Sequence, residues 1–210
     1  MRKLTVIALF VGILCVPSFA ITGLGIGIHG GQTSGYTYDL LDNQFGAIAE
    51  SLGVSIDDVT FEEELFNIGA HLKFGTLPII DFYGFIDYSW KKKEIYNDLD
   101  FTISDVAVGI SAKKHFGMMA LKPYLGAGFA IHRLAYSIKS DDVSINGVPV
   151  NTLIIPEDQN KTGYHALVGV ELNLPVFPID PYVEYRYNWI TTDDEPTKYS
   201  MIEAGLTFSL

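Results

Sequence analysis

Cysteine is almost absent from this sequence. The single cysteine, Cys15, lies near the N-terminus, so the chain beyond it has no thiol and cannot be held by an internal disulfide. Leu14 precedes Cys15, where a lipoprotein signal would have a small residue. We therefore expect neither a disulfide framework nor a lipid-modified cysteine.

Long hydrophobic runs are missing as well. After residue 20 no stretch of about 18 residues is both apolar and uncharged, whereas a membrane-spanning helix needs about 20. A helical membrane protein is therefore excluded. Hydrophobic residues nevertheless make up 48% of the chain and aromatic residues 13%, so this apolar content must be arranged in another way.

Basic residues are few. The chain has 14 Lys and Arg against 25 Asp and Glu, which gives a formal net charge of −11. This acidic balance argues against nucleic acid as a partner and against a basic patch for membrane surfaces. We predict that no nucleic acid is bound.

The first twenty residues have the layout of a cleaved secretory signal. Two basic residues open the segment, an apolar run follows, and Ser18 and Ala20 are the small residues that a signal peptidase reads. The sequence thus predicts a signal peptide at 1–20 and a single domain at 21–210.

Alternation of apolar and polar residues with period two follows this signal. Such alternation is typical of β-strands with one apolar face. In one segment Ile68, Ala70 and Leu72 alternate with Gly69 and His71. The eight predicted strands lie at about 22–30, 66–75, 80–90, 102–113, 122–136, 163–174, 181–190 and 199–210.

The second face of these strands combines glycine with acids and bases, which does not suit a solvated exterior. The inverse arrangement, with apolar residues facing lipid and charged residues filling the lumen, fits better. Backbone in lipid must be fully paired, so the sheet must close. The fold class predicted is all-β, an eight-stranded antiparallel transmembrane β-barrel with up-and-down topology. A soluble, lipocalin-like barrel with a ligand in its cup is the competing fold. The predicted salt-bridge network of the lumen consists of Lys73, Asp87, Asp105, Lys113, Lys122, Glu171, Glu184, Arg186 and Glu203.

Aromatic residues and connection lengths agree with a membrane barrel, which has aromatic belts, short periplasmic turns and long outer loops. One predicted belt contains Tyr88, Trp90, Tyr187 and Trp189, and the other Phe74, Phe116, Phe177 and Phe208. The predicted short turns are 75–79, 114–121 and 175–180, and the predicted outer loops are 31–65, 91–101, 137–162 and 191–198.

Three short motifs carry a resemblance to a known group. They are KPYLGAG at 122–128, EYRY at 184–187 and the terminal AGLTFSL at 204–210. These motifs resemble those of the small outer-membrane barrels related to the outer membrane protein A transmembrane domain, a group that includes OmpX-like proteins and opacity-type adhesins. The resemblance implies an outer-membrane location, contact with outer-membrane lipid and lipopolysaccharide, and insertion by the barrel-assembly machinery. Leu210 departs from the Phe or Trp that usually ends these chains.

The lumen residues allow two interpretations, a conduction path or a filled interior. We favour the filled interior, because eight-stranded barrels are just wide enough for side chains. His71, His132 and His165 all point inward and suggest a zinc site, but their heights along the barrel differ, so polar filling of the lumen is favoured. His132 and Ser137 lie on opposite faces of one strand, so no catalytic site is predicted.

The predicted outer loops carry the remaining hints of function. Apolar residues at helical spacing predict a short helix over about 39–52 in the first loop, which is rich in acidic residues and has no Lys or Arg. A cap over the barrel mouth, a divalent-cation site and a solvated acidic surface are all compatible with this loop, and we favour the last. In the third loop Asn146-Gly147 predicts a hairpin.

The sequence as a whole predicts a non-enzymatic outer-membrane barrel with a polar, largely plugged lumen. Its predicted role is structural or surface-interactive, in adhesion or envelope integrity, with a host or envelope protein as the partner of the outer loops. The alternative is a narrow porin-like conduit for small solutes or apolar molecules that is gated by the first loop. No cofactor is predicted.

Overall fold

The computed structural model describes most of the chain beyond its N-terminal segment. The described residues are 23–35, 64–77, 80–96, 99–116, 120–139, 144–145, 148–149, 159–173, 178–191 and 196–209. The predicted signal at 1–20 and the predicted helix at 39–52 lie outside these residues. No helix in the described part of the chain is long and apolar enough to cross a membrane.

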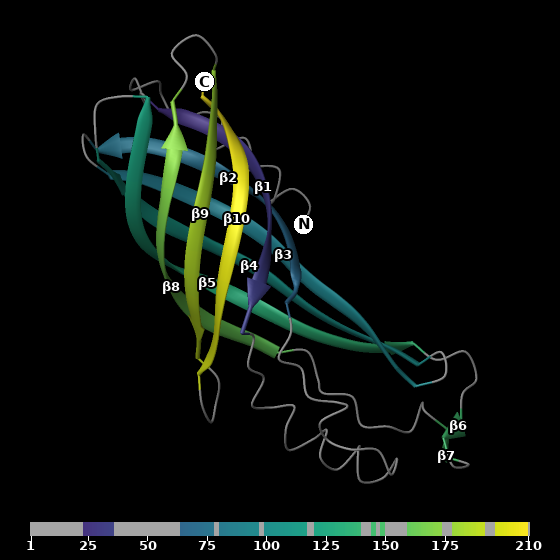
Figure 1. The fold of residues 1–210 in the computed structure, drawn as a ribbon. Helices are drawn as coiled ribbons and strands as arrows, with labels where there is room; N and C mark the ends of the chain where they lie inside the picture. Colours follow the sequence, from purple (N-terminus) through teal and green to yellow (C-terminus); the bar gives the residue numbers. More distant parts are fainter. Residues whose placement is uncertain are drawn as a thin grey trace, which may run out of the picture.

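Eight strands form a closed antiparallel barrel. Figure 1 shows how the labelled strands curve around a common axis. Each strand pairs with its neighbours in the chain, and β1 pairs with β10 to close the sheet, so the predicted fold is confirmed. A separate two-stranded pair lies in the connection between β5 and β8. The barrel strands are β1 (Leu24–Ser34), β2 (Phe66–Leu77), β3 (Ile80–Tyr96), β4 (Leu99–His115), β5 (Leu121–Lys139), β8 (Gln159–Leu172), β9 (Ile179–Ile190) and β10 (Thr197–Ser209).

The two ends of the barrel differ in their connections. β1 begins where β10 ends, since Gly25 pairs with Ser209, and the connections 78–79, 116–120 and 173–178 lie at this end. We call it the inner end. The connections 35–65 and 140–158 lie at the opposite, outer end.

The strand pairing fixes the stagger of the barrel. The row of partners that starts at Thr207 passes through Gly27, His71 and the remaining strands, and returns to β10 at Thr197. This is a stagger of ten residues along β10. With strands about 4.8 Å apart and a rise of about 3.3 Å per residue, the strands tilt by about 40° from the barrel axis.

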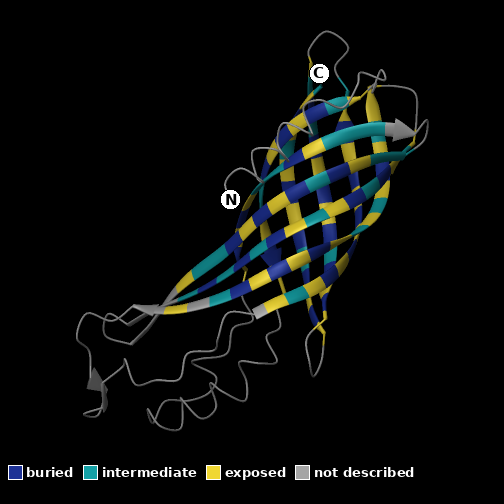
Figure 2. Cartoon of the chain, turned by 180° about the vertical axis from the view of Figure 1, so that it is seen from behind, coloured by how far each residue is buried: buried dark blue, intermediate teal, exposed yellow. Residues whose placement is uncertain are grey.

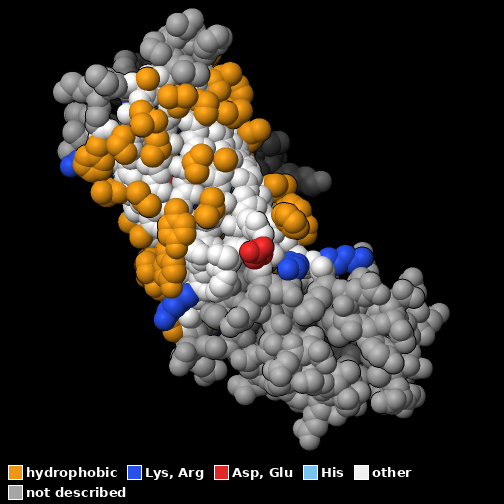
Figure 3. All heavy atoms as spheres, in the orientation of Figure 1, with side chains coloured by type: hydrophobic (Ala, Val, Ile, Leu, Met, Phe, Trp, Pro, Cys, Tyr) orange, Lys and Arg blue, Asp and Glu red, His pale blue; other side chains and the backbone are white. Residues whose placement is uncertain are grey.

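Burial alternates along every barrel strand, as Figure 2 shows. Outward residues such as Ile28, Ile86 and Val168 are apolar and more than half exposed, whereas inward residues such as Asp87 and Glu184 are buried. Apolar side chains cover the visible wall in Figure 3, and charged side chains lie near its ends. The wall is apolar and the interior polar, which is the reverse of a soluble barrel and contradicts the lipocalin-like alternative.

Three strands extend beyond the rest at the outer end. β2 pairs with β3 only as far as Trp90, and β8 pairs with β5 only as far as Leu134, yet β3, β4 and β5 continue to pair with one another. The prediction of a loop at 91–101 is therefore wrong, because only 97–98 separates β3 from β4. The lysines of this segment interrupt the apolar alternation, but backbone pairing does not require an apolar face. We call the paired residues 91–96, 99–104 and 135–139 the outer extension.

The two-stranded pair in the connection 140–158 agrees with the predicted hairpin. Its strands are β6 (Ser144–Ile145) and β7 (Val148–Pro149), and Ile145 pairs with Val148. Asn146 and Gly147 themselves lie outside the described residues.

Candidate functional site

Arg186 on β9 forms the centre of the lumen. Its guanidinium donates to three carboxylates: Nη1 to Asp87 Oδ2 at 2.7 Å, and Nη2 to Glu184 Oε1 and to Glu203 Oε1, both at 3.2 Å. Its Cζ also lies 4.7 Å from the centre of the Phe85 ring. These groups come from β3, β9 and β10 and are all buried, so one planar cation ties opposite walls of the barrel together.

Lys113 on β4 extends this network toward the inner end. Its ammonium donates to Glu184 Oε2, which also accepts a 2.9 Å hydrogen bond from the Tyr124 hydroxyl. The Lys113 Nζ atom lies 4.5 to 5.3 Å from the ring centres of three tyrosines. These rings are those of Tyr83, Tyr124 and Tyr182. The cation is thus enclosed by aromatic faces and one carboxylate.

A second ionic group lies at the inner end. Lys73 Nζ lies 3.4 Å from Asp81 and 3.9 Å from Glu171, and His115 contacts the same two carboxylates at 3.3 and 3.6 Å. Lys122 pairs in register with Glu171 and adds a further positive charge beside it. Asp81 and His115 were not in the predicted network.

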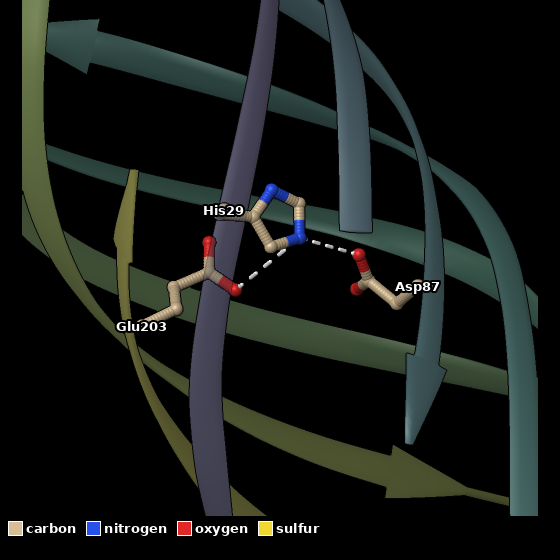
Figure 4. A group of neighbouring side chains, drawn as sticks. All are labelled: His29, Asp87 and Glu203. Carbon is tan, nitrogen blue, oxygen red and sulfur yellow. Dashed lines mark hydrogen bonds and ion pairs between the residues drawn. The ribbon is translucent and has the colours of Figure 1, made fainter. Parts of the chain in front are cut away.

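His29 on β1 is another lumen residue that was not in the predicted network. Figure 4 shows it between Asp87 and Glu203. Its Nε2 lies 2.7 Å from Asp87 Oδ1 and 3.8 Å from Glu203 Oε2. The sequence pattern could have placed His29 inside the barrel, because this residue continues the inward face of Gly25 and Gly27. We call the linked set the central cluster; it consists of His29, Asp87, Lys113, Glu184, Arg186 and Glu203.

The three histidines considered for zinc point inward, as expected, but each has a different partner. His71 bonds to Thr207 at 2.9 Å, His165 to Ser111 at 2.8 Å, and His132 to Asp105 at 2.9 Å. They act as polar filling and do not gather into one site. Asp105, a member of the predicted network, pairs with His132.

An apolar layer lies at the outer end of the lumen. Its four side chains are at most 2% exposed and come from different parts of the barrel wall: Leu65, Ile103, Leu134 and Ile190. Each lies near the outer end of its strand or, for Leu65, one residue before β2. These buried apolar side chains contribute to the filling of the lumen near its outer end.

Glycine on the inward face makes room for the buried side chains. A Cβ atom added to Gly69 would lie 2.2 Å from His29 Nε2 and 2.4 Å from Asp87 Oδ1, whereas one added to Gly30 would meet nothing closer than 3.6 Å.

We expect Gly69→Ala to lower the free energy of unfolding by about 1–3 kcal/mol, because the added methyl pushes His29 and Asp87 apart. Gly30→Ala is the matched control and should change it by less than about 0.5 kcal/mol. Urea titration of the folded protein in detergent micelles measures both. Equal effects at the two positions would contradict the close packing around His29.

The class of protein follows from this geometry. A closed eight-stranded sheet with an apolar outer wall and a polar, filled interior is a transmembrane β-barrel, because only a closed sheet satisfies its backbone in lipid. Barrels of this kind belong to outer membranes.

Comparison with solved structures gives the same fold. The chain is similar to neisserial surface protein A, with 18% sequence identity and a TM-score of 0.56, over 89% of this chain and 97% of that one. Weaker similarity is found to Ail, the attachment invasion locus protein of Yersinia pestis (16%, TM-score 0.43, 89% and 98%) and to the N-terminal β-barrel domain of Pseudomonas aeruginosa OprF (12%, 0.42, 89% and 99%). No family model and no curated protein sequence matches the chain. The likeness shows the fold of small outer-membrane barrels.

Proposed function

We propose that this protein is a plugged outer-membrane anchor that presents its outer extension and outer loops for contact with other surfaces, and that it performs no catalysis. The observation that carries this proposal is the filling of the lumen by the central cluster. Side chains from β1, β3, β4, β9 and β10 meet there, and all are buried.

The alternative function, a narrow conduit, has less support. A conduit needs a continuous polar path, and here such a path would have to pass the central cluster and then the apolar layer. The gating role considered for the first loop falls on residues outside the described part of the chain.

The outer extension supports a surface role. It carries β3, β4 and β5 beyond the points where β2 and β8 stop pairing, so a three-stranded sheet continues past the barrel wall. Edge strands of this kind offer unpaired backbone groups to partners.

Planar-bilayer recording tests the plugged lumen. We expect the refolded protein to insert without steady conductance, because the central cluster and the apolar layer block the path. Stable openings that change with Glu171→Gln or Arg186→Ala would replace the anchor proposal with the conduit. Insertion is verified separately by protease protection of the reconstituted protein.

Orientation is testable by single-cysteine labelling, because the chain beyond Cys15 has no cysteine. We expect Ser137→Cys, exposed on the outer extension, to react with a membrane-impermeant maleimide on intact cells. Ala120→Cys, exposed at the inner end, should react only after lysis. The opposite pattern would reverse the assignment of the two ends.

The surface role itself is tested by replacing 140–158 with a short Gly-Ser turn and measuring the adherence of expressing cells to cultured epithelial cells. We expect most of the adherence to be lost while the urea midpoint of the barrel is unchanged, because among the described residues the barrel pairs of β5 end at Lys139 and those of β8 begin at Gln159. Undiminished adherence at equal surface expression would argue against adhesion through this connection.

A further inference from the structure

Three donor atoms converge in the middle of the lumen. His29 Nε2, Asp87 Oδ1 and a carboxylate oxygen of Glu203 lie within 4.8 Å of one another, and Figure 4 shows all three side chains turned toward a common point. One imidazole nitrogen and two carboxylate oxygens are a donor set that divalent transition metals accept. The three residues come from β1, β3 and β10, so the closed barrel holds the donors in place.

Glu203 Oε2 is an unpartnered atom within this group. Glu203 is 1% exposed, and its Oε2 atom has no hydrogen-bond partner although it points toward His29 Nε2 at 3.8 Å. A buried carboxylate oxygen without a partner is costly, so such an atom indicates a missing positive group.

The charge balance of the central cluster points the same way. Its three carboxylates, Asp87, Glu184 and Glu203, face two permanent cations, Lys113 and Arg186. The acidic groups of the cluster thus outnumber its permanent bases by one. Neutral imidazole is also the form that binds a metal.

Arg186 binds the second oxygen of each of the two carboxylates. It holds Asp87 Oδ2 and Glu203 Oε1, the carboxylate oxygens that do not face His29. Such outer contacts orient the ligand oxygens of a metal site. A cavity of about 10 Å³ lined by His29, Arg186 and Glu203 adjoins the group. This volume is at the lower limit of what one water molecule needs, and a water is the fourth ligand that tetrahedral zinc can take.

We propose that His29, Asp87 and Glu203 form a binding site for one divalent transition-metal ion of the zinc class inside the lumen. The ion replaces the proton between His29 and Asp87 and binds the free oxygen of Glu203. It joins β1, β3 and β10 and strengthens the plug. This inference is independent of the surface role proposed above. Because the site is buried, the ion enters while the barrel folds.

The test is refolding of the protein into detergent micelles with Co²⁺ or Zn²⁺, followed by removal of loosely bound metal with a weak chelator. We expect one ion per folded chain by elemental analysis and visible d–d absorption for Co²⁺. His29→Ala and Glu203→Gln should abolish both signals. His165→Ala and Glu171→Gln are the matched controls, also buried in the lumen, and should retain them.

Wild-type protein without stoichiometric metal would overturn the proposal, and so would binding that persists in folded His29→Ala or folded Glu203→Gln. X-ray absorption of the wild-type zinc form decides the matter even where a variant fails to fold. The proposal requires a single imidazole and otherwise oxygen ligands at about 2.0–2.2 Å. Two or more imidazoles would place the ion elsewhere.

Discussion

Arg186→Ala is expected to lower the free energy of unfolding by about 3–5 kcal/mol, because it leaves buried carboxylates without their cation. Asp87, Glu184 and Glu203 would all lose a charge-assisted hydrogen bond, and none of them is open to solvent. Urea unfolding in micelles, followed by tryptophan fluorescence, measures the loss.

The cause of this loss is separable from general damage to the barrel. Adding Glu203→Gln to Arg186→Ala should restore part of the stability, since it removes one of the stranded charges. Arg133→Ala, at an exposed position of β5, should change the free energy of unfolding by no more than about 0.5 kcal/mol. A loss below about 1 kcal/mol for Arg186→Ala would mean that the lumen admits water and screens the carboxylates.

Val168→Arg is the second large effect that we expect. Val168 lies on the wall of β8, 56% exposed, with Leu125 and Tyr185 as its partners on β5 and β9. An arginine in the middle of the lipid-facing wall should cost about 2–4 kcal/mol, because its charge must be stabilised in hydrocarbon. Unfolding of protein reconstituted in phospholipid vesicles measures this cost.

The control for Val168→Arg is a substitution to arginine outside the lipid-facing wall, on the outer extension. Ser137→Arg places the charge at an exposed position beyond Leu134, the last residue of β5 that pairs with β8, and should be nearly neutral. Equal and small effects at the two positions would show that the apolar wall does not face lipid.

Alternation predicts the faces of the strands well, because a period of two assigns every side chain to one face once a single apolar position is known. Glu184, Arg186 and Glu203 were placed inside the barrel on this basis. The same rule also places His29 inside the barrel, on the glycine-bearing face of β1. In a narrow barrel such a face is where bulky side chains from other strands gather.

The partners inside the lumen were not predictable from alternation. Arg186 and Asp87 are 99 residues apart and come from strands that do not pair with each other. Their contact depends on the height of each residue along the axis, and this height is set by the ten-residue stagger that appears only when β1 meets β10. The loop prediction at 91–101 failed for a related reason, because pairing of the backbone there continues without an apolar face.

Because β3, β4 and β5 are continuous, a force applied to a partner bound at the outer extension is transmitted to the barrel. The same strands that cross the wall form the extension, so no hinge separates the two within these described residues. The hydrogen bonds between antiparallel strands lie perpendicular to the chain. A pull along the strands therefore loads many of these bonds in shear at once, rather than opening them one after another, and the tension passes directly into the closed barrel.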